Sequence, residues 1–252
     1  MKRNGAIVGA MVAAAGIVGV AALAGSRKRL GSPFEAIGWG DLYGAEGDIS
    51  ESPNQGYDPG IVSSDWISPG SGTPPQALIS GPANDPEIAA LLAEIDGLLA
   101  QAGINLRQIC ARELCELPKA PGRPCSIPPR SLWRNIVPTA VLVQTMRTRL
   151  GFPLELRGYR PPDYNAAVGG SKRSQHQWFG AIDVYAWPSV RNASTRVAVA
   201  EAGARVFVEN PAEAIGFGVY GKATPSNIHL DTGFRRRTWR DAQIWIDRIR
   251  DA

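Results

Sequence analysis

Histidine and cysteine are both scarce in this chain of 252 residues, which holds two histidines, His176 and His229, and three cysteines, Cys110, Cys115 and Cys125. The cysteine spacing matches no zinc ribbon, and no further Cys or His lies near enough to complete one. An odd number of cysteines leaves room for one bridge and one free thiol in an oxidising compartment. We expect Cys115 to pair with Cys125, because that bridge would close a proline-rich loop.

Charge of one sign is missing from two long stretches. Residues 1–30 carry five basic residues and no acid, and residues 31–106 carry eleven acids and no Lys or Arg. Residues 107–252 hold 22 basic residues and 12 acids, a net charge of +10. Such a surface is either simply solvated or attracted to an anionic polymer such as a cell wall or nucleic acid. No zinc knuckle, recognition helix or RNA-binding signature accompanies the charge, so we expect no nucleic-acid partner.

Uncharged, apolar residues fill positions 5–25, between a basic pair and a second basic cluster. A bilayer core requires about 20 apolar residues, so this run predicts a membrane-anchoring helix. The sequence ALA at residues 22–24 also fits a signal-peptidase site, and a buried helix of a soluble protein is the third possibility. The basic cluster just beyond favours an uncleaved anchor, which makes residues 1–30 a membrane anchor or signal segment.

Periodicity and internal repeats are absent from the acidic stretch that follows. Gly, Pro and Ser occupy 20 of the 42 positions from 44 to 85. Such a segment cannot bury enough apolar surface to offset its ordering entropy, so residues 31–85 are predicted to be a tether. The folded domain, residues 86–252, is expected to begin with a helix, because Asp85 is a good N-cap and a proline follows it.

Hydrophobic periodicity predicts a mixed fold for this domain. The fold class expected is α+β, a small, mostly antiparallel sheet flanked by helices. Residues 104–130 are expected to be irregular. The predicted helices cover residues 86–102, 137–150, 161–169, 194–208 and 241–250, and the predicted strands cover residues 154–159, 181–185, 217–220 and 227–231.

Both histidines occur in segments typical of zinc ligands. His176 is followed seven residues later by Asp183, and His229 stands in the sequence NIHLDTG at residues 227–233. Two imidazoles and one carboxylate are the protein ligands of a catalytic zinc site whose fourth position is open to water. The sequence therefore predicts that His176, Asp183 and His229 bind Zn2+.

Four separated blocks carry a family resemblance. They are LRGYRPPDYN at 156–165, GGSKRSQH at 169–176 with AID at 181–183, HLDTG at 229–233, and RTW at 237–239. Together they resemble peptidase family M15, the zinc D-Ala-D-Ala carboxypeptidases and related peptidoglycan endopeptidases, over roughly residues 130–240. The resemblance implies a hedgehog/D-Ala-D-Ala-peptidase-like fold, zinc on the three residues named above, Arg160 as a residue that helps hold the substrate peptide, and Ser174 in the lining of the site.

The chain also departs from the family pattern at three positions. Where some members carry a Glu base three residues before the last zinc histidine, this chain has Ser226, and where others carry His two residues before it, the chain has Asn227. Phe179 stands where a glycine often follows the first histidine. Asp231 is the nearest remaining candidate for general acid/base work, and an orienting role behind a ligand is the alternative.

Two classes of function follow. The first is a zinc peptidase that cuts peptide stems of peptidoglycan as a carboxypeptidase or endopeptidase, with a virion-associated lysin or endolysin as a variant. The second is a non-catalytic peptidoglycan-binding module that keeps its metal, which the residues at 226 and 227 favour. Either would work at the cell envelope, anchored or secreted, or in a virion membrane.

Overall fold

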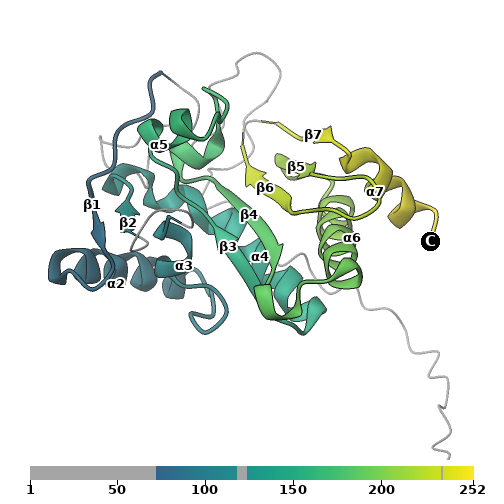
Figure 1. The fold of residues 1–252 in the computed structure, drawn as a ribbon, viewed down its shortest axis with the longest axis horizontal. Coiled ribbons are helices and arrows are strands. Elements are labelled where there is room, and N and C mark those ends of the chain that lie inside the picture. Colours follow the sequence, from purple (N-terminus) through teal and green to yellow (C-terminus); the bar gives the residue numbers. More distant parts are fainter. Residues whose placement is uncertain (1–71, 118–123, 234) are drawn as a thin grey trace, which may run out of the picture. The chain divides into compact units, whose positions relative to one another are not determined.

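The computed structural model describes residues 72–117, 124–233 and 235–252 (Figure 1). The apolar run at 5–25, and with it the expected N-terminal helix, lies outside the described residues, as does most of the tether. Among the helices of the described part, none combines the length and the apolar character needed to cross a membrane.

A five-stranded sheet in the order β3-β4-β6-β5-β7 carries the architecture. All neighbouring pairs are antiparallel except β5 and β7, which run parallel. The prediction of an α+β fold with a mostly antiparallel sheet is therefore confirmed. The strands are β3 (Leu154–Arg157), β4 (Ala181–Ala186), β5 (Ile215–Val219), β6 (Ile228–Thr232) and β7 (Arg237–Arg240).

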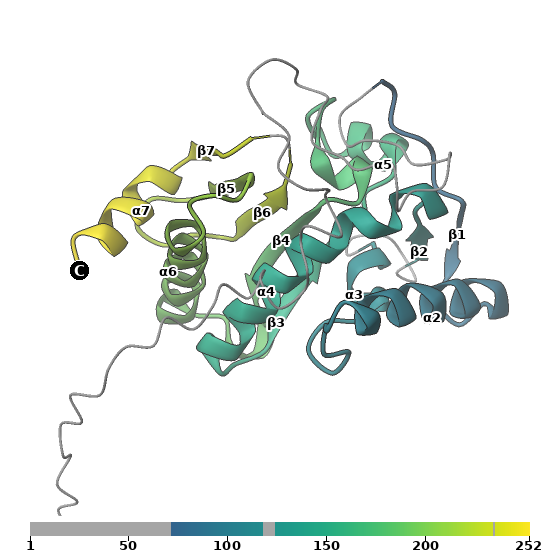
Figure 2. The same ribbon diagram turned by 180° about the vertical axis from the view of Figure 1, so that it is seen from behind.

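Three helices pack on this sheet, α4 (Ile136–Leu150), α6 (Ala193–Glu209) and α7 (Ala242–Arg250). Figure 2 shows α4 on one side of the sheet, where it packs against β4 and β6. The approach of α6 requires a glycine, because a Cβ on Gly203 would lie 2.5 Å from the side chain of Ile228. The glycine inside a helical pattern is thus explained by close helix–sheet packing.

A second, two-stranded sheet includes residues that precede the predicted start of the domain at residue 86. Strand β1 (Ile79–Pro82) pairs antiparallel with β2 (Pro124–Ile127), so the end of the expected tether is part of the fold. Helix α2 (Pro86–Gln101) then begins as predicted, with the Asp85 carboxylate accepting hydrogen bonds from two backbone N–H groups. Nor is the stretch 104–130 irregular throughout, because it holds β2 and the short helix α3 (Ala111–Cys115).

The cysteines do not form the expected bridge. Cys110, Cys115 and Cys125 are all free thiols. Cys115 and Cys125 are fully buried, and burial raises the pKa of Cys115 well above its usual value and that of Cys125 to about 11. Both therefore behave as small apolar core residues, and the thiolate needed for disulfide exchange is disfavoured.

Candidate metal centre

The three residues predicted to bind zinc come together from three elements. His176 lies in the short 3-10 helix η4 (Gln175–Trp178), Asp183 in β4 and His229 in β6. Asp183 and His229 are directly opposite each other in the antiparallel register of these two strands. All three are buried, and they form the one potential metal-binding group found among the described residues.

The atoms of this triad that face one another form a nearly equilateral triangle. His229 Nδ1 lies 3.1 Å from His176 Nε2 and 2.9 Å from Asp183 Oδ1, and the remaining side, His176 Nε2 to Asp183 Oδ1, is 3.2 Å. Ligand atoms about 2.0–2.1 Å from a tetrahedral zinc ion are separated by about 3.3 Å. The triangle therefore has the dimensions of three corners of a zinc tetrahedron.

Hydrogen bonds on the outer side of the triad orient both imidazole rings. His176 Nδ1 lies 2.7 Å from the carbonyl oxygen of Gly158, and His229 Nε2 lies 3.0 Å from Asp231 Oδ2. If each of these nitrogens carries the ring proton, the nitrogen that faces the triangle presents a lone pair. Two imidazole lone pairs and one carboxylate oxygen then converge, which is the arrangement that a metal cation satisfies.

The pKa directions also indicate that the triangle attracts a cation. Burial and the neighbouring Arg160 lower the pKa of His176, whereas the two histidines outweigh burial and hold the pKa of Asp183 well below its usual range. For His229 burial acts downward, but hydrogen bonds to Asp183 and Asp231 raise its pKa to about 9. One positive charge, a proton or a metal ion, is therefore stabilised where these groups meet.

Asp231 lies behind His229, on the side away from the triangle. Its carboxylate has no exposure to solvent, and both of its oxygens are 3.0 Å from Nη2 of Arg237. The ring of Trp239 packs against His229, with centroids 5.0 Å apart. Of the two roles considered for Asp231, the geometry matches the orienting one, because a carboxylate sealed by Arg237 and His229 has no opening toward a substrate.

Two glycines on β5 make room for this group, and sequence reasoning missed both. Gly216 pairs with Asp231 and Gly218 pairs with His229 across the β5–β6 ladder. A Cβ on Gly216 would lie 2.4 Å from an Asp231 oxygen, and one on Gly218 would lie 2.4 Å from the Trp239 ring. The signal was present in the sequence, since alternating glycines in a strand often mark a close approach of other groups.

Arg160 lies beside the triad. Its Nη2 donates to Asp183 Oδ2 at 3.0 Å, so it holds the carboxylate oxygen that points away from the two imidazoles. Its backbone N–H donates to the carbonyl of His176. The side chain is 22 % exposed, which leaves part of the guanidinium open to solvent beside the triad.

Helix α4 and the residues before it hold the turn that carries His176. Asn135 and Thr139, one helical turn apart, donate from their side chains to the carbonyls of Trp178 and Gly180. Phe179, which lies between Trp178 and Gly180, has a φ angle of 55°, in the left-handed conformation that glycine adopts readily. The departure from glycine at this position therefore keeps the backbone conformation and adds a buried aromatic ring.

The remaining candidate residues lie at the surface or make local contacts. Ser174 precedes η4, is partly exposed, and its side chain caps no backbone N–H there. Ser226, an exposed residue, donates from Oγ to Asn227 Oδ1 at 2.8 Å. The two positions that carry bases in relatives therefore bond to each other in this chain.

Part of the chain matches a known protein family. The family described as Peptidase M15 matches residues 98–210, a segment that includes His176 and Asp183 and ends before His229. His229, the third corner of the triangle, lies outside the matched segment. It reaches the other two residues because β6 pairs with β4. No curated protein matches the chain.

Proposed function

Because the chain belongs to peptidase family M15, we propose that it is a zinc-dependent peptidase that hydrolyses amide bonds in the peptide stems of peptidoglycan. The observation that carries the proposal is the triangle of His176 Nε2, Asp183 Oδ1 and His229 Nδ1, with sides of 2.9–3.2 Å. When the two outer ring nitrogens carry the protons, only lone pairs face the centre of the triangle. The triangle also has the size that a tetrahedral zinc ion requires.

Zinc in such a site supplies an open coordination position, lowers the pKa of water and polarises a scissile carbonyl. His176, Asp183 and His229 would hold the ion. The Gly158 carbonyl and the Asp231 carboxylate fix the two rings from behind, which limits the reorientation that binding requires. The residues present therefore fit the ion both in ligand type and in outer support.

We assign Arg160 a double role. One nitrogen of its guanidinium fixes the outer oxygen of Asp183, and the exposed remainder can donate to a carbonyl or carboxylate of a stem peptide. A planar guanidinium offers several donors in a fixed geometry, which an ammonium group cannot match. Arg160 would thereby couple substrate position to the position of a metal ligand, and Ser174 would line the nearby surface.

Asp231 is assigned an orienting role rather than that of general base. Full burial and two oxygens held by Arg237 keep it from reaching a bound peptide. Its contact with His229 Nε2 is the carboxylate–histidine–metal arrangement that sets the tautomer of a metal ligand.

The location we propose is the cell envelope. The apolar run at 5–25 would anchor the chain in a membrane, and the acidic, Gly/Pro/Ser-rich stretch would let the domain reach the wall. The net charge of +10 over residues 107–252 would favour binding to an anionic wall polymer. In a virion-associated lysin or an endolysin, the same three segments would bring the domain to the cell wall.

Digestion of purified muropeptides tests the proposal. The zinc-loaded chain should release peptide fragments, detected by mass spectrometry, and a chelator should stop the release until zinc is restored. His176→Ala should be inactive, whereas Asn227→Ala, a change at a partly exposed residue near the third ligand, should stay active. Equal cleavage by the wild type and His176→Ala would refute the proposal.

A non-catalytic, zinc-containing peptidoglycan-binding module is the second candidate. It is favoured by Ser226 and Asn227, which replace the usual bases and bond to each other. This reading predicts stoichiometric zinc and sedimentation with purified wall, without the release of any peptide. The same digestion therefore separates the two functions.

A further inference from the structure

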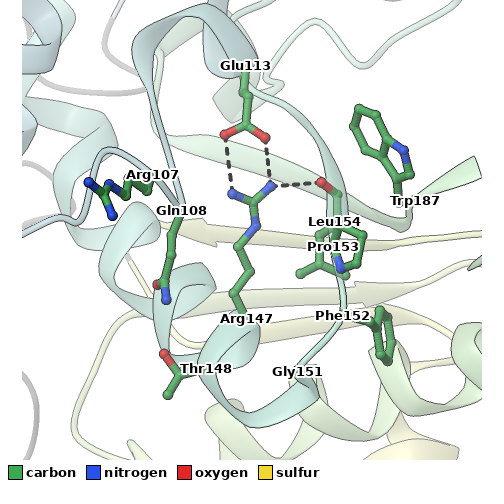
Figure 3. A pocket seen from close by; sticks show the side chains of 10 residues that line it. All are labelled: Arg107, Gln108, Glu113, Arg147, Thr148, Gly151, Phe152, Pro153, Leu154 and Trp187. Carbon is green, nitrogen blue, oxygen red and sulfur yellow. Dashed lines mark hydrogen bonds and ion pairs between the residues drawn. The ribbon is translucent and has the colours of Figure 1, made fainter.

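A cavity of about 550 Å³ lies at the opposite end of the β3–β4 pair from the triad (Figure 3). Its walls come from α3, the C-terminal end of α4, the start of β3 and the residue directly after β4. The triad lies toward the other ends of these strands, where Arg157 pairs with Asp183. The cavity is therefore separate from the metal centre, although one strand connects them.

Trp187 forms one wall of this cavity and is 42 % exposed. Among the aromatic side chains that the structure describes, it is the only one in the exposed class. An indole ring that remains in water keeps a large apolar face available for a ligand. Figure 3 shows the ring across the hollow from the polar side chains of Arg107 and Gln108.

One charged side chain in the lining of the cavity, Arg147, is paired with a carboxylate. Arg147 donates to both oxygens of Glu113, at 3.2 and 2.7 Å, and to the carbonyl of Leu154 at 2.7 Å. Its positive charge is thus neutralised, which argues against a simple anion as the ligand. The amide of Gln108 and the guanidinium of Arg107 also line the cavity and provide donors and an acceptor, and the Thr148 hydroxyl, which donates to the carbonyl of Gln144, can still accept.

We propose that this cavity binds a sugar ring of the peptidoglycan glycan strand, an inference that rests on the proposed function. An N-acetylated amino sugar has one apolar ring face that suits Trp187, and hydroxyl and amide groups that suit mixed donors and acceptors. The volume is within the range of about 300–1,000 Å³ that is usual for small-ligand sites.

The strand that connects the cavity with the metal centre sets the distance between the two sites. Asp183 and Trp187 are four residues apart, an even separation that keeps both on one face of extended chain. At about 3.3 Å per residue this is about 13 Å. An extended stem peptide spans that distance with about four residues. With its sugar in the cavity, a stem would present a bond near its carboxyl end to the metal centre, rather than its first peptide bond.

Titration with tetra-N-acetylchitotetraose, a peptide-free oligosaccharide of the same amino sugar, tests the cavity by calorimetry. Wild-type protein should bind saturably, and Trp187→Ala should weaken binding by about tenfold or more, because an aromatic stacking partner is lost. Trp187→Phe should recover part of the affinity. Ile244→Ala, which alters another exposed apolar side chain on α7, should bind like the wild type.

Circular dichroism and zinc content, unchanged in Trp187→Ala, would show that the variant is folded. Absence of saturable binding by the wild type, or equal binding by Trp187→Ala, would overturn the proposal. Oligosaccharide binding should persist in His176→Ala, so this result is independent of hydrolysis. A protein that binds the sugar but cuts no peptide contradicts the proposed function alone, and one that cuts stems without binding the sugar contradicts this inference alone.

Discussion

Gly216 faces Asp231 across the β5–β6 ladder, and the space that its missing side chain leaves is filled by the Asp231 carboxylate. The support behind His229, a proposed metal ligand, therefore depends on a residue with no side chain, on the neighbouring strand and two positions along the ladder from the partner of His229. This dependence can be measured directly.

Gly216→Ala should lower both stability and zinc affinity. The added Cβ would lie 2.4 Å from a buried oxygen, so Asp231 must move and its contact with His229 must change. Overpacking of this kind destabilises by about 1–3 kcal/mol. Gly97→Ala is the matched control, because nothing lies within 4 Å of its added Cβ in helix α2. That change should stabilise by up to about 1 kcal/mol. Denaturant unfolding and zinc competition would show both effects, and equal behaviour of the two variants would contradict the expectation.

Asp231→Asn should weaken zinc binding more than it affects catalysis at saturating zinc. The variant loses the negative charge that holds Arg237 and His229, and comparable changes behind metal ligands reduce affinity by about 10–100-fold. Competition with a chromogenic chelator would measure the affinity, and hydrolysis would be assayed at high zinc. Asp251→Asn, an exposed change near the C-terminal end, is the control. Normal zinc affinity with lost turnover would instead restore Asp231 as a general base.

His176→Ala and His229→Ala should each lose stoichiometric zinc. Either change leaves two protein ligands, which is fewer than catalytic zinc sites use. Elemental analysis after dialysis would report the metal content, with Asn227→Ala as the neighbouring control. Full zinc retention in either histidine variant would remove that residue from the proposed centre.

A chain beginning at residue 86 should be less stable than one beginning at residue 72. The shorter chain lacks β1, which pairs with β2 over four residue pairs and adds a side-chain contact between Ser80 and Ser126, and it also lacks the Asp85 cap of α2. A loss of about 2–3 kcal/mol would lower the melting temperature by roughly 5–10 °C. Differential scanning calorimetry of the two chains is the measurement, and equal melting temperatures would show that neither β1 nor the cap adds stability.

Glu155 should stabilise the fold only above acidic pH. Burial alone would raise its pKa, but Arg157 and Arg191 outweigh this and hold the pKa below its usual 4.5. A lowered carboxyl pKa gives stability that is present above the unfolded value and is lost as the pH falls through the folded value. Glu155→Gln should therefore destabilise by no more than about 1 kcal/mol at pH 7, because the group is partly exposed, and by less at pH 3. Urea unfolding at both pH values would test this, with Glu201→Gln as the exposed control.

Local patterns predicted much of the fold. The start of α2 at Asp85 and the glycine end of α4 at Gly151 follow from capping chemistry, and both are found. Strand β1 was missed because a four-residue strand among glycines and prolines has no period of its own. It is defined by its partner β2, which is more than 40 residues away in the chain.

In the candidate site, too, local patterns identified some features, whereas contacts between distant residues decided the others. His176, Asp183 and His229 were found by residue type and spacing, and the structure brings them together. The role of Asp231 could not be decided from its position two residues after His229, because period two places it on the same side of the strand but gives no information about Arg237. The expected Cys115–Cys125 bridge rested on the proline-rich loop that it would close, and a loop sequence does not report how two sulfurs pack; both thiols are free and buried.

The central place of β6 has a consequence for the order of events during synthesis. His176 and Asp183 can meet as soon as η4 and β4 have formed, but two ligands make a weak and unselective site. His229 arrives only with a strand that must insert between β4 and β5, its neighbours on either side. If the proposed ligands bind zinc, a chain still being synthesised would be unable to retain the ion until β6 has been made and inserted.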